Sequence, residues 1–270
     1  MMNYTVTLIL FRVKQCIVTT VFIFLAQHAF SQQVNQTTKP DLETDRPDQT
    51  ESASIVAARS FQLETGFYFE KATAGNTERI YTAYPTTLLR IGLLKGIEVR
   101  AEGTYQNFIV EENAKTNVNG FGPLTIGAKV KFWEESGFRP QTAFMTMITL
   151  PVGHDAFTPE NPEPNLRLLF KNSLTDQLDL SHNLAYGWED GNAVKSYSVS
   201  LCMALNDRIG AFGEVFGDKI DGEKAIHSAD TGITFLVLPN LQLDLAAGTT
   251  INSPYPEYFV TTGISVRLPR

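Results

Sequence analysis

Charged side chains recur at every second position in two segments of the sequence. Glu98, Arg100 and Glu102 form one series, and Lys129 and Lys131 form the other. Residues two apart on an extended strand point to the same face, so each series would line one surface. On neighbouring strands the two series could form a ladder of ion pairs, or they could line a path that selects solutes by sign and size. Both interpretations stay open on the sequence alone.

The same alternation places further charged residues on this polar face. The candidates for lining the interior are Glu64, Arg90, Glu98, Arg100, Glu102, Lys129, Lys131, Arg167, Lys171, Glu214, Asp230, Asp244 and Arg267. A second candidate site is a compact motif nearer the N-terminus, formed by Asp45, Arg46, Pro47 and Asp48.

Serine and histidine residues of the predicted strands could in principle form a catalytic pair. A barrel hydrolase needs a serine within hydrogen-bond reach of a histidine that a third group orients. The alternation points His182 to the apolar face and Ser173 and Ser181 to the polar face, so they do not form a pair. The sequence therefore predicts no catalytic serine site.

Metal and cofactor motifs are also missing from the sequence. His154 and His227 have Asp155 and Asp230 nearby, but no fixed spacing of metal ligands joins them. Cys202 has no redox partner after the leader, and there is no glycine loop suited to phosphate. We therefore expect no enzyme activity, no metal and no cofactor.

The elements that position the charged residues are predicted β-strands. From Phe61 onward apolar and polar residues alternate with period two, which indicates pleated strands with one apolar face. The apolar faces carry no Asp, Glu, Lys or Arg, and His182 is their one titratable residue. A Lys or Arg facing lipid at the midplane would cost about 2–4 kcal/mol. This exclusion favours a membrane barrel over a soluble sandwich.

The connections between the strands are predicted to alternate between short turns and long polar loops, which is typical of outer-membrane barrels. The short turns are expected at 94–96, 134–137, 175–176, 206–207 and 239–240. The long loops are expected at 71–79, 107–122, 151–165, 188–194, 217–225 and 250–257. About twelve strands of roughly 9–12 residues result, and roughly 9–11 residues suffice for a spanning strand.

Residues 1–31 have the pattern of a cleaved signal peptide. Arg12 and Lys14 precede the apolar run Cys16–Ala26, and Ala29–Ser31 forms a small-x-small cleavage site. The run is short for a spanning helix, which needs about 20 apolar residues. An uncleaved anchor is the alternative.

Residues 32–60 form a polar segment without a clear period, followed by the predicted barrel at 61–270. Pro40 and Pro47 disfavour a continuous strand ladder in this segment. It is either a flexible periplasmic leader or a segment folded into the lumen, where Arg46 and its flanking carboxylates could meet lumen charges.

The charge balance excludes nucleic acid as a partner. The 270 residues include 22 Lys and Arg against 29 Asp and Glu, and the isoelectric point is about 5.2. No basic stripe is present to neutralise phosphates.

Several short motifs occur along the chain after the leader, namely Thr44–Ser52, Phe61–Phe67, Gly122–Lys129, Leu150–Gly153 and Asn240–Asp244 followed by Gly248. These motifs resemble the transporter family labelled "MetA-pathway of phenol degradation". The resemblance covers essentially all of the chain after the leader, and the Asp-Arg-Pro-Asp block is its most distinctive part. It implies an outer-membrane barrel associated with the passage of small, often aromatic or hydrophobic compounds.

Together these observations predict an all-β protein, an up-and-down antiparallel transmembrane β-barrel in the outer membrane. The expected function is passive or gated passage of small solutes, and the alternative is a closed structural or surface-binding barrel. The expected partners are outer-membrane lipid, a small-molecule solute and the barrel-assembly machinery.

Overall fold

The computed structural model describes residues 42–112, 114–253 and 257–269, all within one compact unit that spans Pro40–Arg270. Its strands are β1 (Phe61–Ala74), β2 (Thr77–Leu94), β3 (Ile97–Glu111), β4 (Lys115–Phe121), β5 (Leu124–Trp133), β6 (Gln141–Leu150), β7 (Glu163–Thr175), β8 (Leu178–Glu189), β9 (Asn192–Ala204), β10 (Ile209–Ile220), β11 (Ile226–Leu238), β12 (Leu241–Thr250) and β13 (Glu257–Leu268). The described ranges contain no helix that is long and apolar enough to cross a membrane.

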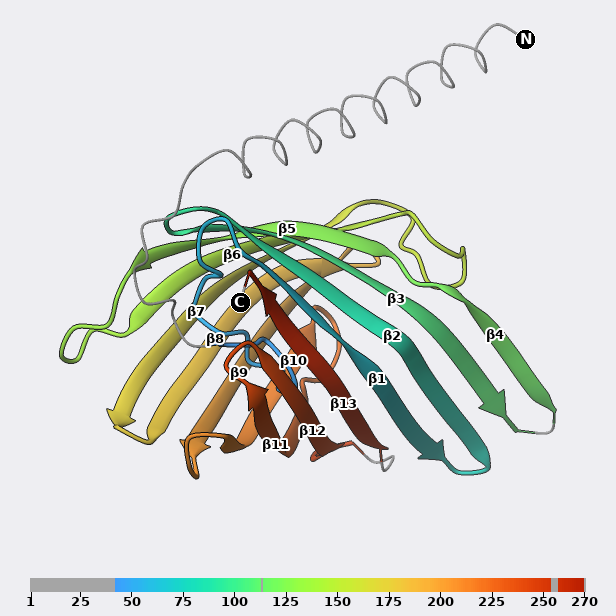
Figure 1. The fold of residues 1–270 in the computed structure, drawn as a ribbon. Helices are drawn as coiled ribbons and strands as arrows, with labels where there is room; N and C mark the ends of the chain where they lie inside the picture. The colour runs from blue at the N-terminus through green and yellow to red at the C-terminus, as the bar shows by residue number, and fades with distance from the viewer. Residues whose placement is uncertain (1–41, 113, 254–256, 270) are drawn as a thin grey trace, which may run out of the picture. The chain divides into compact units, whose positions relative to one another are not determined.

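The strands close into an antiparallel barrel (Figure 1). β1 pairs with both β2 and β13, and every other neighbouring pair follows chain order except around β3. Ile97–Glu102 of β3 pairs with β5, whereas Tyr105–Glu111 pairs with β4. β4 and β5 therefore share one position, and the ring has twelve positions. Pro123, between β4 and β5, has no N–H for the ladder, which explains the break.

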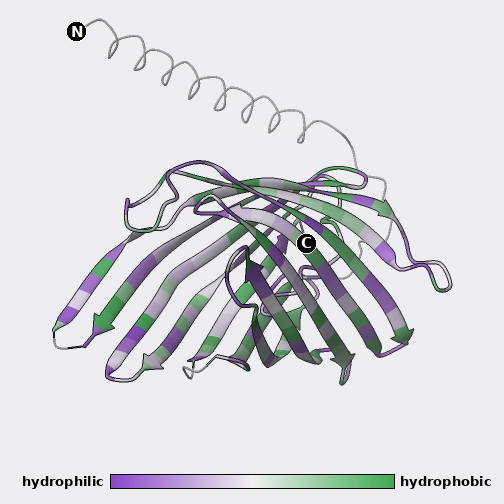
Figure 2. Ribbon diagram, turned by 180° about the vertical axis from the view of Figure 1, so that it is seen from behind, coloured by the Kyte–Doolittle hydropathy of each residue, from purple (hydrophilic) through white to green (hydrophobic). Residues whose placement is uncertain are grey.

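The pleat places polar residues inside the barrel and apolar residues outside. On β12 the side chains of Gln242 and Asp244 are buried, while Leu243 and Leu245 are exposed. Figure 2 shows the same alternation of hydropathy along the strands. A soluble sandwich has the opposite arrangement, with its apolar faces closed against each other. The predicted transmembrane barrel is therefore confirmed.

The predicted alternation of short and long connections holds only in part. The short turns at 95–96, 176–177 and 239–240 lie where they are expected, but some of the expected long loops are short turns. β1 and β2 are joined by Gly75 and Asn76 alone, where a loop over 71–79 was expected. β8 and β9 are joined by Asp190 and Gly191, which both have positive φ, 48° and 79°, as tight hairpin turns require. The segment 151–162 is a long connection, as expected.

The reason is that polar residues continue along strands that are longer than the membrane requires. β2 has 18 residues, whereas about 9–11 suffice to span the hydrocarbon layer. Lys71 and Glu78, in the arms of the β1–β2 hairpin, form an ion pair of 2.7 Å. Polarity marks where such strands leave the lipid, but it does not mark where they end.

Residues 42–60 precede the first strand and contain no strand of their own. They contact inward-facing side chains around the ring, from Glu64 on β1 to Glu214 on β10 and Asp244 on β12. Figure 1 shows this segment in blue inside the barrel. We call residues 42–60 the plug. We call the barrel end with the turns 95–96, 176–177 and 239–240 the short-turn rim.

Candidate functional site

Asp45 of the plug meets three cations that project inward from β2, β3 and β5. Its carboxylate lies 3.1 Å from Arg90, 3.0 Å from Arg100 and 3.1 Å from Lys129. All four side chains are at most 2% exposed. Burial by itself raises the pKa of Asp45, but the three cations outweigh it and hold the pKa well below its ordinary value. Asp45 is therefore ionised and binds the plug to this wall.

Carboxylates of the wall neutralise the same cations. Arg90 makes a forked contact with Glu98, at 2.8 and 3.0 Å, and it also contacts Glu64 at 3.0 Å. Glu64 accepts hydrogen bonds from the backbone amides of Asp45 and Arg46, at 3.0 and 3.1 Å. Because these groups are buried and paired, removal of one partner costs about 3–5 kcal/mol.

Arg46 binds the wall formed by β1, β12 and β13. Its guanidinium lies 3.0 Å from Asp244 and donates to the hydroxyl of Thr261 at 2.8 Å. Gly66 and Gly263, which pair in register, lie beneath it. A Cβ on Gly66 would lie 2.6 Å from Arg46 Nη2, and one on Gly263 would lie 2.5 Å from Arg46 Nε. The two glycines therefore make room for the arginine.

Gln49 and Thr50 contact the opposite wall, on β9 and β10. The backbone amide of Gln49 donates to Glu214 at 2.7 Å. The hydroxyl of Thr50 donates to Glu214 and lies 2.9 Å from the hydroxyl of Ser198. These contacts are hydrogen bonds to one carboxylate and one serine, with no ion pair between the described residues of the two sides.

Asp48 faces like charge on this wall. Burial and the neighbouring Glu214 raise the pKa of Asp48 well above its ordinary value, and Asp230 adds to the effect, while a hydrogen bond from Ser200 opposes it. Among the described residues, none of these three carboxylates forms an ion pair. The plug is therefore held by opposite charge at Asp45 and meets like charge at Asp48.

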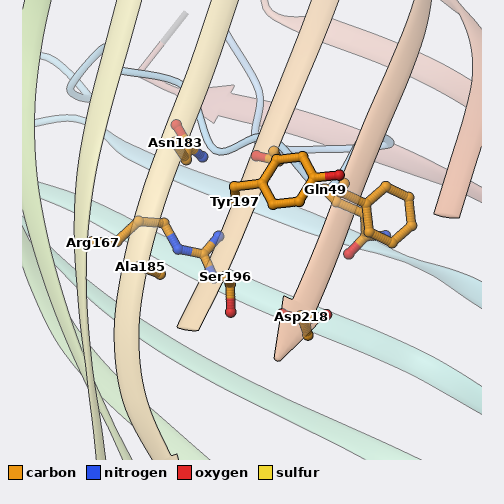
Figure 3. Close-up of a pocket in the computed structure, with 9 residues that line it drawn as sticks. Gln49, Arg167, Asn183, Ala185, Ser196, Tyr197 and Asp218 are labelled. Carbon is orange, nitrogen blue, oxygen red and sulfur yellow. The ribbon is translucent and has the colours of Figure 1, made fainter. Parts of the chain in front are cut away.

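Two cavities lie on either side of residues 48–50, along the wall of β7 to β10. The cavity farther from the short-turn rim has a volume of about 190 Å³, and Figure 3 shows Gln49, Arg167 and Asn183 around it. The cavity nearer the short-turn rim has a volume of about 460 Å³, and Asp48 and Thr50 also line it. Residues 48–50 thus contribute to the lining of both cavities.

The other charged residues predicted to line the interior form no ion pair with Asp45 among the described residues. Glu102 contacts Arg100 at 3.5 Å, Lys131 contacts Glu134 at 2.8 Å, Lys171 contacts Glu43 at 3.2 Å and Asp179 at 3.0 Å, and Arg267 donates to Gln62 at 2.8 Å. Arg167 lines the smaller cavity, and Pro47 lines the larger one.

The predicted ion-pair ladder between the two charge series is wrong in its partners. Glu98 does pair in register with Lys129. However, Glu98 forms its ion pair with Arg90 on the other neighbouring strand, and Lys129 forms its own with Asp45. The plug supplies a carboxylate that a ladder of strands alone would lack.

The residues considered for catalysis are not brought together. His182 stacks on Phe170 with ring centroids 4.9 Å apart, and Ser181 is buried on the alternate face of β8. Within the described ranges no group of three or more His, Cys, Asp or Glu residues could hold a metal ion.

Sequence reasoning missed the uncharged residues that contact the plug and line the cavities. They carry no charge, so charge alternation gave no signal for them, but the small residues at inward positions of β1 and β13 were a usable signal for close approach. The missed residues are Gln62, Gly66, Thr86, Asn183, Ser198, Thr261 and Gly263.

Residues 44–268 match the family model described as "Putative MetA-pathway of phenol degradation". The chain belongs to this family. No curated protein matches this family member by sequence. The matched region begins at the plug motif and includes every described strand.

Solved structures similar to this family member are outer-membrane barrels. An outer membrane channel from Pseudomonas putida F1 has a TM-score of 0.59 and 13% identity, over 84% of this chain and 100% of that chain. The KdgM porin has a TM-score of 0.53 and 8% identity, over 76% and 98%. The translocator domain of the autotransporter NalP from Neisseria meningitidis has a TM-score of 0.53 and 10% identity, over 77% and 88%. The chain thus has the fold of these outer-membrane β-barrels.

Proposed function

We propose that this protein is an outer-membrane channel for small solutes and that residues 48–50 of the plug are its gate. The observation that carries the proposal is the pair of cavities that this short part of the plug lines on one wall. A ring of twelve positions lies between an eight-stranded barrel filled by side chains and sixteen strands that leave an open channel. A plug that moves aside along one wall would join the two cavities.

The contacts of the plug favour movement at the β10 wall. Asp45 is bound by three buried cations, so release there would leave uncompensated charge. Gln49 and Thr50 are bound chiefly through Glu214, and Asp48 lies beside like charge. Residues 48–50 can therefore detach while Asp45 stays in place.

We assign the charged candidates to two roles. Glu64, Arg90, Glu98, Arg100 and Lys129 hold the plug, whereas charges along the cavities face the solute. The chain has no catalytic role in this proposal. The barrel-assembly machinery is its partner during insertion into the membrane.

A closed structural or surface-binding barrel is the second candidate function. The observation that favours it is the fully buried ion network at Asp45, which would hold the plug permanently if residues 48–50 never detach. This alternative predicts no ion or solute flux under any condition that leaves the barrel folded.

The experiment is single-channel recording in planar bilayers with the purified processed protein, alongside liposome swelling with small neutral solutes. The wild type is compared with Glu214→Ala, which removes the acceptor for both Gln49 and Thr50. The matched control is Glu134→Ala, an exposed carboxylate near the short-turn rim. We expect brief openings in the wild type, longer openings in Glu214→Ala and no change in the control. Absence of flux from all three folded proteins would overturn the channel and leave the closed barrel.

A further inference from the structure

We propose that the cavity of about 190 Å³ beside Gln49 is a binding site for a small aromatic carboxylate. This inference deepens the proposed function and rests on it, because the cavity lies on the suggested path. The site consists of a cation without an anionic partner, a buried amide without hydrogen bonds and an aromatic ring.

Arg167 supplies the cation. Among the described residues it forms no hydrogen bond or ion pair, and its buried Nε has no partner. Glu102 is close enough to interact with it electrostatically, but Glu102 forms its ion pair with Arg100. Guanidinium groups bind carboxylates through two parallel hydrogen bonds. An unpaired arginine at this depth therefore favours an anionic ligand with a planar head.

Small neighbours leave space in front of this guanidinium. Ala185 on β8 is the register partner of Arg167, and Ser196 on β9 is the register partner of Ala185. Figure 3 shows the side chain of Arg167 extending past Ala185 toward Ser196. A carboxylate can approach here without displacing a large side chain.

Asn183 supplies the second polar group. Its side chain is 3% exposed, and neither its amide nitrogen nor its amide oxygen has a hydrogen-bond partner among the described residues. A buried amide without partners carries an uncompensated desolvation cost. It also lines the same cavity as Arg167. A ligand oxygen that accepts from Asn183 would recover this cost.

Phe216 supplies an apolar surface. It lines the cavity from β10 and packs on Phe259, with ring centroids 6.3 Å apart. Tyr197 in Figure 3 belongs to the alternate face of β9, where its hydroxyl lies 3.0 Å from His227 Nδ1. Phe216 thus supplies an aromatic ring to the cavity lining, suited to stack on one aromatic ring of a ligand.

The size of the cavity and its remaining charge restrict the ligand further. An apolar cavity of about 150 Å³ accommodates benzene, so about 190 Å³ suits one ring with a short substituent. Asp218 also lines the cavity and disfavours a second negative charge. The geometry therefore selects a monoanion whose carboxylate lies toward Arg167 and Asn183.

The test is calorimetric titration of the purified full-length protein in detergent with benzoate, benzyl alcohol and acetate. We expect saturable binding of benzoate and binding at least about tenfold weaker for the other two probes, because each lacks one part of the recognition. Arg167→Gln should weaken benzoate binding by about tenfold or more, since it removes a charged hydrogen bond. It should leave the weak binding of benzyl alcohol unchanged.

Arg208→Gln is the matched control, because it removes the same charge from the exposed β9–β10 turn. It should bind benzoate as the wild type does. Asn183→Leu, a second variant of similar size that removes the amide, should also weaken benzoate binding. The folding of all variants is checked by heat-modifiable gel mobility. Equal affinity of benzoate and benzyl alcohol, or an unchanged affinity in Arg167→Gln, would overturn the inference. Benzoate binding without flux in bilayers would instead support the site and overturn the channel.

Discussion

Asp45 and Asp48 lie three residues apart in the plug, yet their surroundings are opposite. Asp45 is surrounded by Arg90, Arg100 and Lys129, which lower its pKa. Asp48 is buried beside Glu214 and Asp230, which raise its pKa. Asp45 is thus attracted to its surroundings, whereas Asp48 is repelled by the carboxylates beside it. A single short segment is therefore fixed at one end and releasable at the other.

The largest expected effect comes from removing the attractive end. Asp45→Asn leaves three buried cations without their shared anion, so the free energy of unfolding should fall by about 3–5 kcal/mol. The plug should also leave its wall, and the channel conductance should rise. Urea unfolding and bilayer recording measure the two effects. A variant as stable and as closed as the wild type would mean that Asp45 does not anchor the plug.

A smaller loss is expected at the second anchor. Arg46→Gln removes the contact with Asp244 and the hydrogen bond to Thr261. Because the Arg46 side chain is 15% exposed, water can replace part of these contacts, and the free energy of unfolding should fall by about 1.5–3 kcal/mol in total. A double-mutant cycle with Asp244→Asn isolates the pair. We expect the two substitutions to be strongly non-additive, and strict additivity would show that the two side chains do not interact in the membrane.

Substitution of Asp48, which faces like charge, should close the channel rather than open it. Asp48→Asn keeps the shape of the side chain and removes its charge beside Glu214. We expect the open fraction of the channel to fall about fivefold, which corresponds to about 1 kcal/mol. Single-channel recording gives the open fraction directly. An increase would show that Asp48 is attracted to its wall and would contradict its repulsion by Glu214.

The smallest effect is the pH dependence of the wild type. The raised pKa of Asp48 means that the plugged state holds a proton that the released state gives up. The stabilisation of the plugged state by this proton is complete below 3.8, the ordinary pKa of Asp48. It is lost as the pH rises through the raised pKa of Asp48 in the plugged state. Asp45 behaves oppositely, because its contribution is lost only as the pH falls through its lowered pKa.

The open fraction should therefore increase as the pH rises above 3.8, and Asp48→Asn should flatten the increase. Glu214 and Asp230 face Asp48 and also titrate, so a weaker residual dependence is expected in the variant. Recordings at constant ionic strength test this, and an open fraction that falls with rising pH would contradict the assignment.

The sequence was sufficient for the barrel because the physical requirement is strict at each position. Every second side chain must tolerate lipid, so Leu243 and Leu245 alternate with Gln242 and Asp244. The strand ends were not predictable in the same way. Lys71 and Glu78 read as a loop, but they lie in strands that extend beyond the lipid.

The site was predictable in its charges but not in its pairing. Arg90, Arg100 and Lys129 were identified on the inward face, yet their common partner is Asp45, a residue outside the strands. Periodicity constrains only the strands, so it cannot place a plug that has no period. Asn183 was missed because an uncharged amide has no signature in a pattern of charges.

The most direct test of gating by residues 48–50 is a reversible cross-link. The hydroxyls of Thr50 and Ser198 lie 2.9 Å apart, so Thr50→Cys with Ser198→Cys places two thiols together, in a Cys202→Ser background that removes the free cysteine. Conductance is recorded from the same bilayer before and after reduction with dithiothreitol. We predict a closed channel when the disulfide is formed and wild-type openings after reduction. Equal conductance in the two states would show that solutes pass without movement of residues 48–50.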